Sequence, residues 1–243
     1  MHGPLLGEFM GTLVLILLGD SVVANVLLKK SKGENSGWIV ITTGWGLAVV
    51  AGIFTAIAFG SPGAHINPAV TLAVAVLSGN WSNVGLFWVA QFLGAFTGAG
   101  LVWLTYLLHW KETPDAGAKL AVFCTGPAIR NLPANLLTEI IATTCLIVVG
   151  FSFGSKAVST TGLPAGFGPW LWGVLVWVIG LGLGGPTGYA LNPARDFGPR
   201  LAHAILPISN KGSSDWGYAL VPIVGPLIAG GLGAAIVRFA GIN

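Results

Sequence analysis

Two stretches of this apolar chain repeat the tripeptide Asn-Pro-Ala and set it beside groups that can bind a polar molecule. They are GAHINPAV at 63–70 and GYALNPARDFGPR at 188–200. Asparagine is a good helix N-cap, and proline suits the first helical turn, where its missing N–H is not needed. Asn67-Pro68-Ala69 and Asn192-Pro193-Ala194 therefore each predict the start of a helix. Helix N-termini carry partial positive charge, so such a pair attracts oxygen acceptors and repels cations.

Arg195 lies three residues after Asn192 and extends this chemistry. In a membrane a buried arginine is costly and is usually functional. An arginine combined with half-helix dipoles can form an electrostatic barrier to protons and cations in a pore. The alternative is that Arg195 lies among lipid headgroups, where it would have no such role.

The composition places these motifs in a membrane. Charged residues make up 8% of the 243 residues, hydrophobic residues make up 54%, and the mean hydropathy is +0.82. A soluble domain carries about 25% charged residues, so a soluble fold of this size could not cover its surface. The run 37–110 contains no Asp, Glu, Lys or Arg. The net charge of +3 gives no indication of nucleic-acid binding.

The sequence gives no indication of a cofactor, a metal site or an enzyme. Cys124 and Cys145 fit neither a disulfide framework nor a metal site. The four histidines, at positions 2, 65, 109 and 203, do not have metal-ligand spacing. No nucleophile–base pair or phosphate-binding loop is evident.

Apolar segments predict an all-α membrane protein. A helix needs about 20 apolar residues to cross a bilayer, and lipid leaves the backbone no other hydrogen-bond partners. Six segments are that long, at roughly 5–28, 38–59, 84–108, 136–154, 170–189 and 217–237. Two more, at 67–79 and 192–206, follow the Asn-Pro-Ala motifs and are long enough for only half a bilayer.

The chain contains an internal repeat. Glu8 and Glu139 each open an E-x-x-x-T pattern that is followed by a span, another span and an Asn-Pro-Ala motif. Each half then holds three spans, and because three is odd, the second half enters the membrane from the opposite side. We expect a single channel domain over 1–243, with inverted repeats at about 5–108 and 136–240 linked by a loop at 109–135. The two half-helices would meet near the midplane.

Irregular, glycine-rich segments precede both half-helices, at 60–66 and 184–191. Such backbone at membrane depth is tolerated only where it is buried in protein or lines a wet cavity. Its carbonyl groups would then offer a row of acceptors along a pore.

Polar residues within the spans are expected to support these segments. Glu8 and Glu139 are predicted to accept hydrogen bonds from the irregular backbone of their own halves; the alternative is a proton relay. His65 is expected to brace its loop, and Gln91 to satisfy loop backbone groups. Asp20, near the end of the first span, is expected to be in water.

Together these residues resemble the aquaporin, or major intrinsic protein, family over about residues 5–240. The resemblance rests on both Asn-Pro-Ala motifs, Gly63-Ala-His65, both E-x-x-x-T patterns, Gln91 and Arg195. It implies a right-handed bundle of six transmembrane helices plus two half-helices, and a homotetramer with one pore per subunit. It also implies a location in the cell membrane with cytoplasmic termini. The positive-inside rule gives the opposite orientation, because 29–35, 109–134 and 208–215 carry most of the Lys and Arg.

Within the family, the chain is similar to the glycerol facilitators. Asp196 follows Arg195 as in their NPARD motif, and Gly180 stands where narrow water pores have a histidine. Tyr189 stands where glycerol facilitators carry Phe, and Trp45-Gly46 resembles their second-span Trp-Gly. The resemblance implies a selectivity filter of Trp45, Gly180, Tyr189 and Arg195, with Asp196 among the supporting residues.

The implied function is passive passage of glycerol, other small neutral solutes and water through a lipid bilayer, with exclusion of ions and protons. The second half is especially similar to facilitators of lactobacillus-type bacteria, which suggests dihydroxyacetone and neutral lactic acid as further solutes. The alternatives are a water-selective aquaporin, an ion- or proton-coupled transporter that uses Glu8 and Glu139, and a structural protein with a closed pore.

Overall fold

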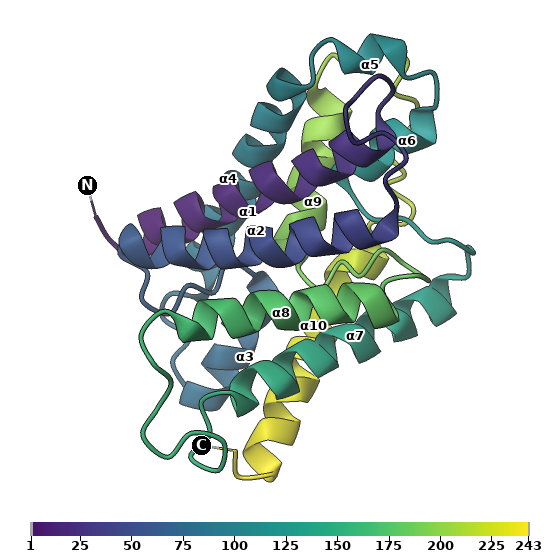
Figure 1. Cartoon of the computed structure of the whole chain (residues 1–243). Coiled ribbons are helices and arrows are strands. Elements are labelled where there is room, and N and C mark those ends of the chain that lie inside the picture. The colour runs from purple at the N-terminus through teal and green to yellow at the C-terminus, as the bar shows by residue number, and fades with distance from the viewer. Residues whose placement is uncertain (1, 243) are drawn as a thin grey trace.

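The fold is entirely helical over the part of the chain that the structure describes. The computed structural model describes residues 2–242 (Figure 1). Its helices, in chain order, are α1 (Pro4–Leu27), α2 (Trp38–Ala58), α3 (Pro68–Ser78), α4 (Val84–Thr105), α5 (His109–Glu112), α6 (Ala116–Phe123), α7 (Leu132–Ser152), α8 (Phe167–Leu183), α9 (Pro193–Ile205) and α10 (Leu220–Phe239). The prediction of an all-α protein is confirmed.

Within residues 2–242, five helices are long and apolar enough to cross a membrane, namely α1, α2, α4, α7 and α10. The remaining predicted span corresponds to α8, which is apolar but has 17 residues. Such a helix is about 26 Å long at 1.5 Å per residue. The predicted span 170–189 is therefore wrong at both ends, because the helix begins at Phe167 and ends at Leu183. It ends there because Gly184, Gly185 and Pro186 follow, and proline disfavours a helical conformation in the residue before it.

The segment 109–135, predicted as a loop, contains two short helices and the start of α7. Asp115 caps α6, since its Oδ1 accepts hydrogen bonds from the backbone N of Gly117 and Ala118. Asn131 caps α7, and Leu132 is its first residue. The predicted span 136–154 thus begins four residues too late, because the capping signal at Asn131 precedes the apolar run.

The two halves have the same order of long, long, short and long helices, and each short helix packs against the other half. In the first half α1 packs against α2 and α4, and in the second α7 packs against α8 and α10. The short helix α3 packs against α10, and α9 packs against α4 (Figure 1). The halves are interlocked, so neither buries its own half-helix alone.

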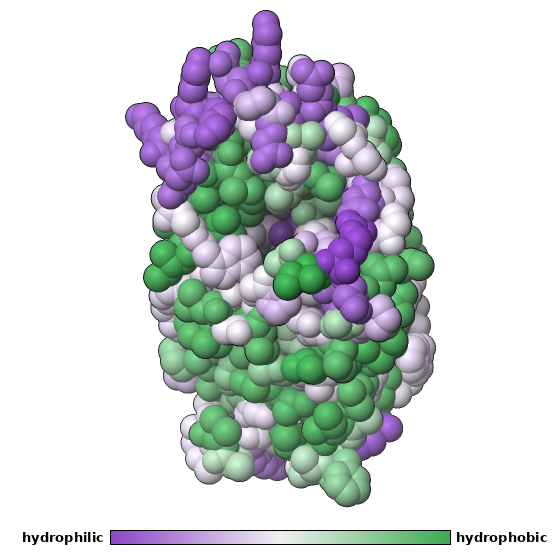
Figure 2. Space-filling view, turned by 90° about the vertical axis from the view of Figure 1, so that its right-hand side faces the viewer, coloured by the Kyte–Doolittle hydropathy of each residue, from purple (hydrophilic) through white to green (hydrophobic). Residues whose placement is uncertain are grey.

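Apolar side chains cover much of the outer surface, as expected for a protein that contacts lipid. Figure 2 shows them over the lower half of one face, with hydrophilic side chains at its upper end and along its right-hand side, next to a hollow. The upper end corresponds to the region of α5 and α6 in Figure 1, whereas both termini lie on the opposite side of the molecule. Among the exposed residues are Ile39, Leu86, Leu104 and Val178.

Glycines allow the close helix packing. A Cβ at Gly46 of α2 would lie 2.8 Å from the carbonyl oxygen of Gly173 in α8, and a Cβ at Gly173 would lie 2.6 Å from the carbonyl oxygen of Gly46. Gly11 of α1 and Gly52 of α2 make the same reciprocal contact, at 2.7 and 2.8 Å. Small residues at helix interfaces in membranes let backbones approach, because packing rather than the hydrophobic effect holds the helices together.

Gly173→Leu should therefore destabilise the protein, since the added side chain has to separate α2 from α8. Overpacking of this kind typically costs about 1–3 kcal/mol, so the midpoint of thermal unfolding in detergent should fall. Gly182→Leu is the matched control on the same helix, because a Cβ at Gly182 meets no atom within 4 Å. Equal midpoints for the two variants would contradict the close contact.

Candidate pore and selectivity filter

The two Asn-Pro-Ala motifs meet, and each asparagine joins the halves. Asn67 caps α3, with its Oδ1 accepting from Ala69 N at 2.8 Å; Asn192 caps α9, with its Oδ1 accepting from Ala194 N at 3.0 Å. The side-chain nitrogen of Asn67 donates to the Leu191 carbonyl at 3.0 Å. That of Asn192 donates to the Ile66 carbonyl at 2.8 Å. An amide nitrogen carries two hydrogens, so each asparagine keeps one for a solute.

The backbone before each motif is held in an unusual conformation at matching positions. Ala64 and Ile66, three and one residues before Asn67, have φ of 41° and 44°. Tyr189 and Leu191, three and one residues before Asn192, have φ of 40° and 56°. Left-handed backbone is unfavourable for such residues, especially for β-branched isoleucine, and costs about 1–3 kcal/mol at each position. Other interactions must therefore hold these segments.

Glu8 supplies much of that support in the first half. Its carboxylate is fully buried and accepts hydrogen bonds from four donors, at 2.6 to 2.9 Å: Ser61 Oγ, His65 N, Ile66 N and Gln91 Nε2. The side chain of His65 lies 3.1 Å from Thr71 Oγ1, to which Gln91 also donates. The structure thus brings together the predicted residues Glu8, His65 and Gln91, but Gln91 bonds to the side chains of Glu8 and Thr71 and not, as predicted, to loop backbone.

Glu139 has the equivalent position in the second half, with fewer bonds. It accepts from the backbone N of Ala190 at 3.0 Å and of Leu191 at 3.2 Å. Its side chain is buried. Both glutamates thus bond to the backbone N–H groups of the residues just before an asparagine.

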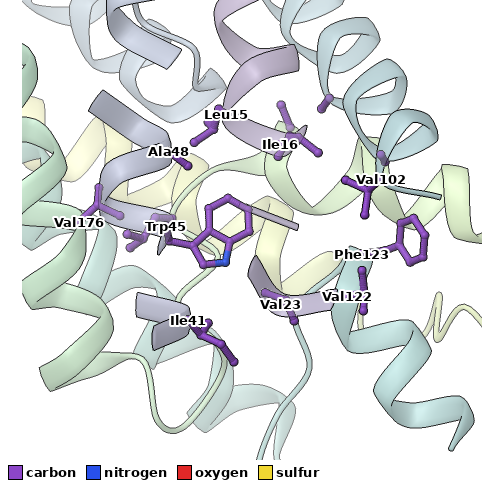
Figure 3. Packing of buried hydrophobic residues seen from close by; sticks show 14 of the residues in the cluster. Leu15, Ile16, Val23, Ile41, Trp45, Ala48, Val102, Val122, Phe123 and Val176 are labelled. Atoms are coloured by element: carbon purple, nitrogen blue, oxygen red, sulfur yellow. The ribbon is translucent and has the colours of Figure 1, made fainter. Parts of the chain in front are cut away.

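Arg195, Trp45 and Tyr189 lie together along one cavity. The Arg195 guanidinium lies over the Trp45 ring, with 4.0 Å from Cζ to the ring centroid, and its Nη1 donates to the Phe123 carbonyl at 3.3 Å. Trp45 lies among apolar side chains of α1 and α2 (Figure 3). A cation over an indole face is stabilised by the ring quadrupole, so the tryptophan fixes the arginine as well as lining the cavity.

Gly180 has a different place from the one expected. It is not among the residues that line the cavity, because the Tyr189 ring lies in front of it. A Cβ at Gly180 would lie 2.7 Å from Tyr189 Cζ and 2.9 Å from its hydroxyl oxygen. The Gly180 carbonyl also accepts from Trp38 Nε1 at 3.0 Å. The glycine makes room for the tyrosine ring rather than directly for a solute.

Asp196 holds the segment at Thr125 and, through Arg200, the segment at Ser214. It accepts from Arg200 Nε at 2.7 Å and from both the backbone N and the hydroxyl of Thr125 at 2.8 Å. Arg200 in turn donates to the carbonyls of Thr125 and Ser214. Sequence reasoning missed Arg200, although its spacing of four from Asp196 places the two on one helix face.

The position of Asp20 differs from the sequence prediction. It is fully buried, not in water, and its Oδ1 lies 3.6 Å from Arg195 Nη1. The physical reason is that Asp20 lies two turns before the end of α1, on the side of the helix that faces Arg195 of α9, and hydropathy alone does not show which side of a helix is buried.

The cavity has a volume of about 430 Å³ and extends from the two Asn-Pro-Ala motifs to Trp45, Tyr189 and Arg195. Both asparagines, both irregular segments and Arg195 line it, facing apolar residues that include Leu15, Val49, Ile53, Leu146 and Val176. Among the described residues no cluster of His, Cys, Asp or Glu could hold a metal ion. A row of polar groups opposite an apolar wall, within a bundle of membrane helices, defines a multi-pass membrane channel.

Comparisons with known proteins agree with this class. The family model "Major intrinsic protein" matches residues 2–237. The chain is 61% identical to a probable glycerol uptake facilitator protein of Thermotoga maritima over 235 residues, covering 96% of this chain and 97% of the relative. It is 53% identical to glycerol uptake facilitator protein 3 of Lactiplantibacillus plantarum, with 96% and 94% covered.

Two further matches are a transporter and a solved structure. A D/L-lactic acid transporter of L. plantarum is 42% identical over the whole of both chains. The X-ray structure of the aquaglyceroporin from Plasmodium falciparum superposes with a TM-score of 0.83 at 27% identity, covering 96% of this chain and 94% of that one. The chain belongs to the major intrinsic protein family.

Glu8→Gln should destabilise the protein more than Glu139→Gln. Glutamine replaces one acceptor oxygen by an NH₂ group, and Glu8 accepts from four donors whereas Glu139 accepts from two. A hydrogen bond to a charged group contributes about 1.5–3 kcal/mol. Thermal unfolding of the two variants in detergent measures the difference. Equal losses of stability would mean that the number of hydrogen-bond donors does not determine how much each glutamate stabilises the protein.

Proposed function

We propose that this protein is a passive channel through which glycerol, other small neutral solutes and water cross the cell membrane, while ions and protons are excluded. The observation that carries the proposal is the filter: a buried guanidinium lies over the Trp45 ring and shares one cavity with the Tyr189 side chain. The relatives named glycerol uptake facilitators, which match along almost the whole chain, support the choice of glycerol.

The filter suits a polyol because its two sides differ in polarity. Glycerol has a hydroxylated edge and a C–H edge. Arg195 and the carbonyl groups of the irregular segments can bind the hydroxyls, whereas Trp45 and the Tyr189 ring offer an apolar corner to the carbons. Beyond the filter, Asn67 and Asn192 offer their free amide hydrogens to the same hydroxyls. Water passes the same path, with fewer polar partners than in a water-selective pore.

Exclusion of cations follows from the charges along the path. The N-termini of α3 and α9 meet there, and each contributes about half a positive charge. Arg195 is a charged side chain that lines the same cavity, so its guanidinium adds positive potential there. This arrangement favours a channel for neutral solutes over a cation channel.

A proton-coupled transporter is the less favoured alternative. Neither Glu8 nor Glu139 is among the residues that line the cavity, and both accept hydrogen bonds from loop backbone. A relay group needs contact with the path and freedom to exchange its proton. The glutamates therefore fit the role of supports for the irregular segments better than that of a relay.

The solute range, assembly and orientation complete the proposal. Dihydroxyacetone resembles glycerol in size and polarity, and the relative named as a lactic acid transporter supports neutral lactic acid as a further candidate. We propose a homotetramer with one pore per subunit in the lipid bilayer, with both termini in the cytoplasm. In keeping with this, the termini lie on the same side of the molecule, away from α5 and α6 (Figure 1). We also propose that the whole chain forms one channel domain.

Stopped-flow light scattering on proteoliposomes tests the proposed function. Under a glycerol gradient, vesicles that contain the protein should reswell much faster than empty vesicles, and dissipation of the proton gradient should leave the rate unchanged. Under a sucrose gradient, water efflux should be moderately faster than in empty vesicles. Fast water efflux without glycerol entry would instead identify a water-selective channel, and uptake that stops with the proton gradient would identify a coupled transporter.

Gly180→Ala should reduce glycerol flux more than water flux. The added methyl group overlaps the Tyr189 ring, so the ring has to move toward the cavity that it lines, and glycerol is the wider solute. Gly182→Ala is the matched control, because the space at Gly182 is open. An equal reduction of both fluxes by Gly180→Ala would show that the Tyr189 ring does not set the width of the filter.

A further inference from the structure

Two adjacent residues of α1 form the wall behind the filter. A Cβ at Gly19 would lie 2.3 to 2.5 Å from three ring atoms of Trp45, so this indole packs directly on the α1 backbone. The next residue, Asp20, is fully buried, and its Oδ1 lies 3.6 Å from Arg195 Nη1. No described residue donates a hydrogen bond to either carboxylate oxygen of Asp20. The Gly19-Asp20 pair thus faces the two residues that make the cation–π contact.

The charges around the filter form two pairs. Asp196 and Arg200 make one, with Arg200 Nε 2.7 Å and Nη2 3.0 Å from the carboxylate oxygens. Among the described residues, the carboxylate that forms an ion pair with Arg195 is that of Asp20, at 3.6 Å, from the other half of the chain. Arg195 also bonds to a carbonyl and lies over Trp45, and both partners are uncharged.

We propose that Asp20 positions Arg195 and balances its charge, so that the filter excludes small anions as well as cations. This inference rests on the proposed function, since it concerns the same filter. Two opposite unit charges about 4 Å apart interact strongly in a site that is shielded from water. Without Asp20 the guanidinium would be an uncompensated positive charge, and such charges attract anions in membrane pores.

The alternative is that Asp20 is only a packing residue, which fills the space between α1 and α9. The two roles separate when the carboxylate is replaced by an amide of the same shape. Asparagine fills the same volume but carries no charge. If Asp20 only packs, Asp20→Asn should therefore leave ion selectivity unchanged.

Asp20→Asn should raise nitrate conductance in planar bilayers at least roughly tenfold over the unmodified protein, while glycerol flux in proteoliposomes persists. Glu112→Gln is the matched control, because it removes the same charge from an exposed pair with Lys30 and should change neither quantity. In Asp20→Asn/Arg195→Gln the nitrate conductance should fall again, since the charge that attracts the anion is gone. Unchanged nitrate conductance in Asp20→Asn would overturn the proposal.

A second comparison decides the question even if Asp20→Asn alone does not fold. Arg195→Gln leaves the Asp20 carboxylate unbalanced, so this variant should conduct K⁺ better than Asp20→Asn/Arg195→Gln does. Equal K⁺ conductance in those two variants would overturn the charge-balancing role. Failure of the unmodified protein to pass glycerol would instead contradict the proposed function, independently of both comparisons.

Discussion

The structure depends on one constraint, which is that backbone polar groups inside a membrane must be satisfied by the protein itself. The segments before Asn67 and Asn192 are not helical, so their N–H and carbonyl groups lack intrahelical partners. Glu8 and Glu139 accept from those N–H groups, and the asparagines donate to carbonyls of the opposite segment. Carbonyl groups that remain can then face a cavity, where a polar solute becomes their partner.

The same interactions explain why the two halves form one unit. Each asparagine bonds to the segment of the other half, and α3 and α9 pack against α10 and α4. The reciprocal glycine contact between Gly46 and Gly173 then brings α2 and α8 together where the halves adjoin. The left-handed residues before the motifs are held between these contacts, so the cost of their backbone conformation is met by the interlocking of the halves.

The filter combines a fixed charge with apolar surfaces. Trp45 packs on Gly19, Arg195 lies over Trp45, and Tyr189 lies against Gly180. Each of these side chains thus packs against a residue of a different helix. Asp20 and Asp196 accompany the two arginines of α9, so the three charges of the second motif, together with a fourth from α1, sum to zero in the buried region. This is consistent with a channel whose solutes are neutral.

The sequence by itself determined the class of fold, the half-helix starts at Pro68 and Pro193, and the residues that support the irregular segments. These follow from local signals: hydropathy, capping residues and matching motifs in both halves. The tertiary structure decided the ends of α8, the helices within 109–135, the place of Gly180 behind Tyr189 and the burial of Asp20 against Arg195. In membrane helices apolar residues face both lipid and protein, so hydropathy does not show which face is buried. The contacts between helices become known only when the helices are packed together.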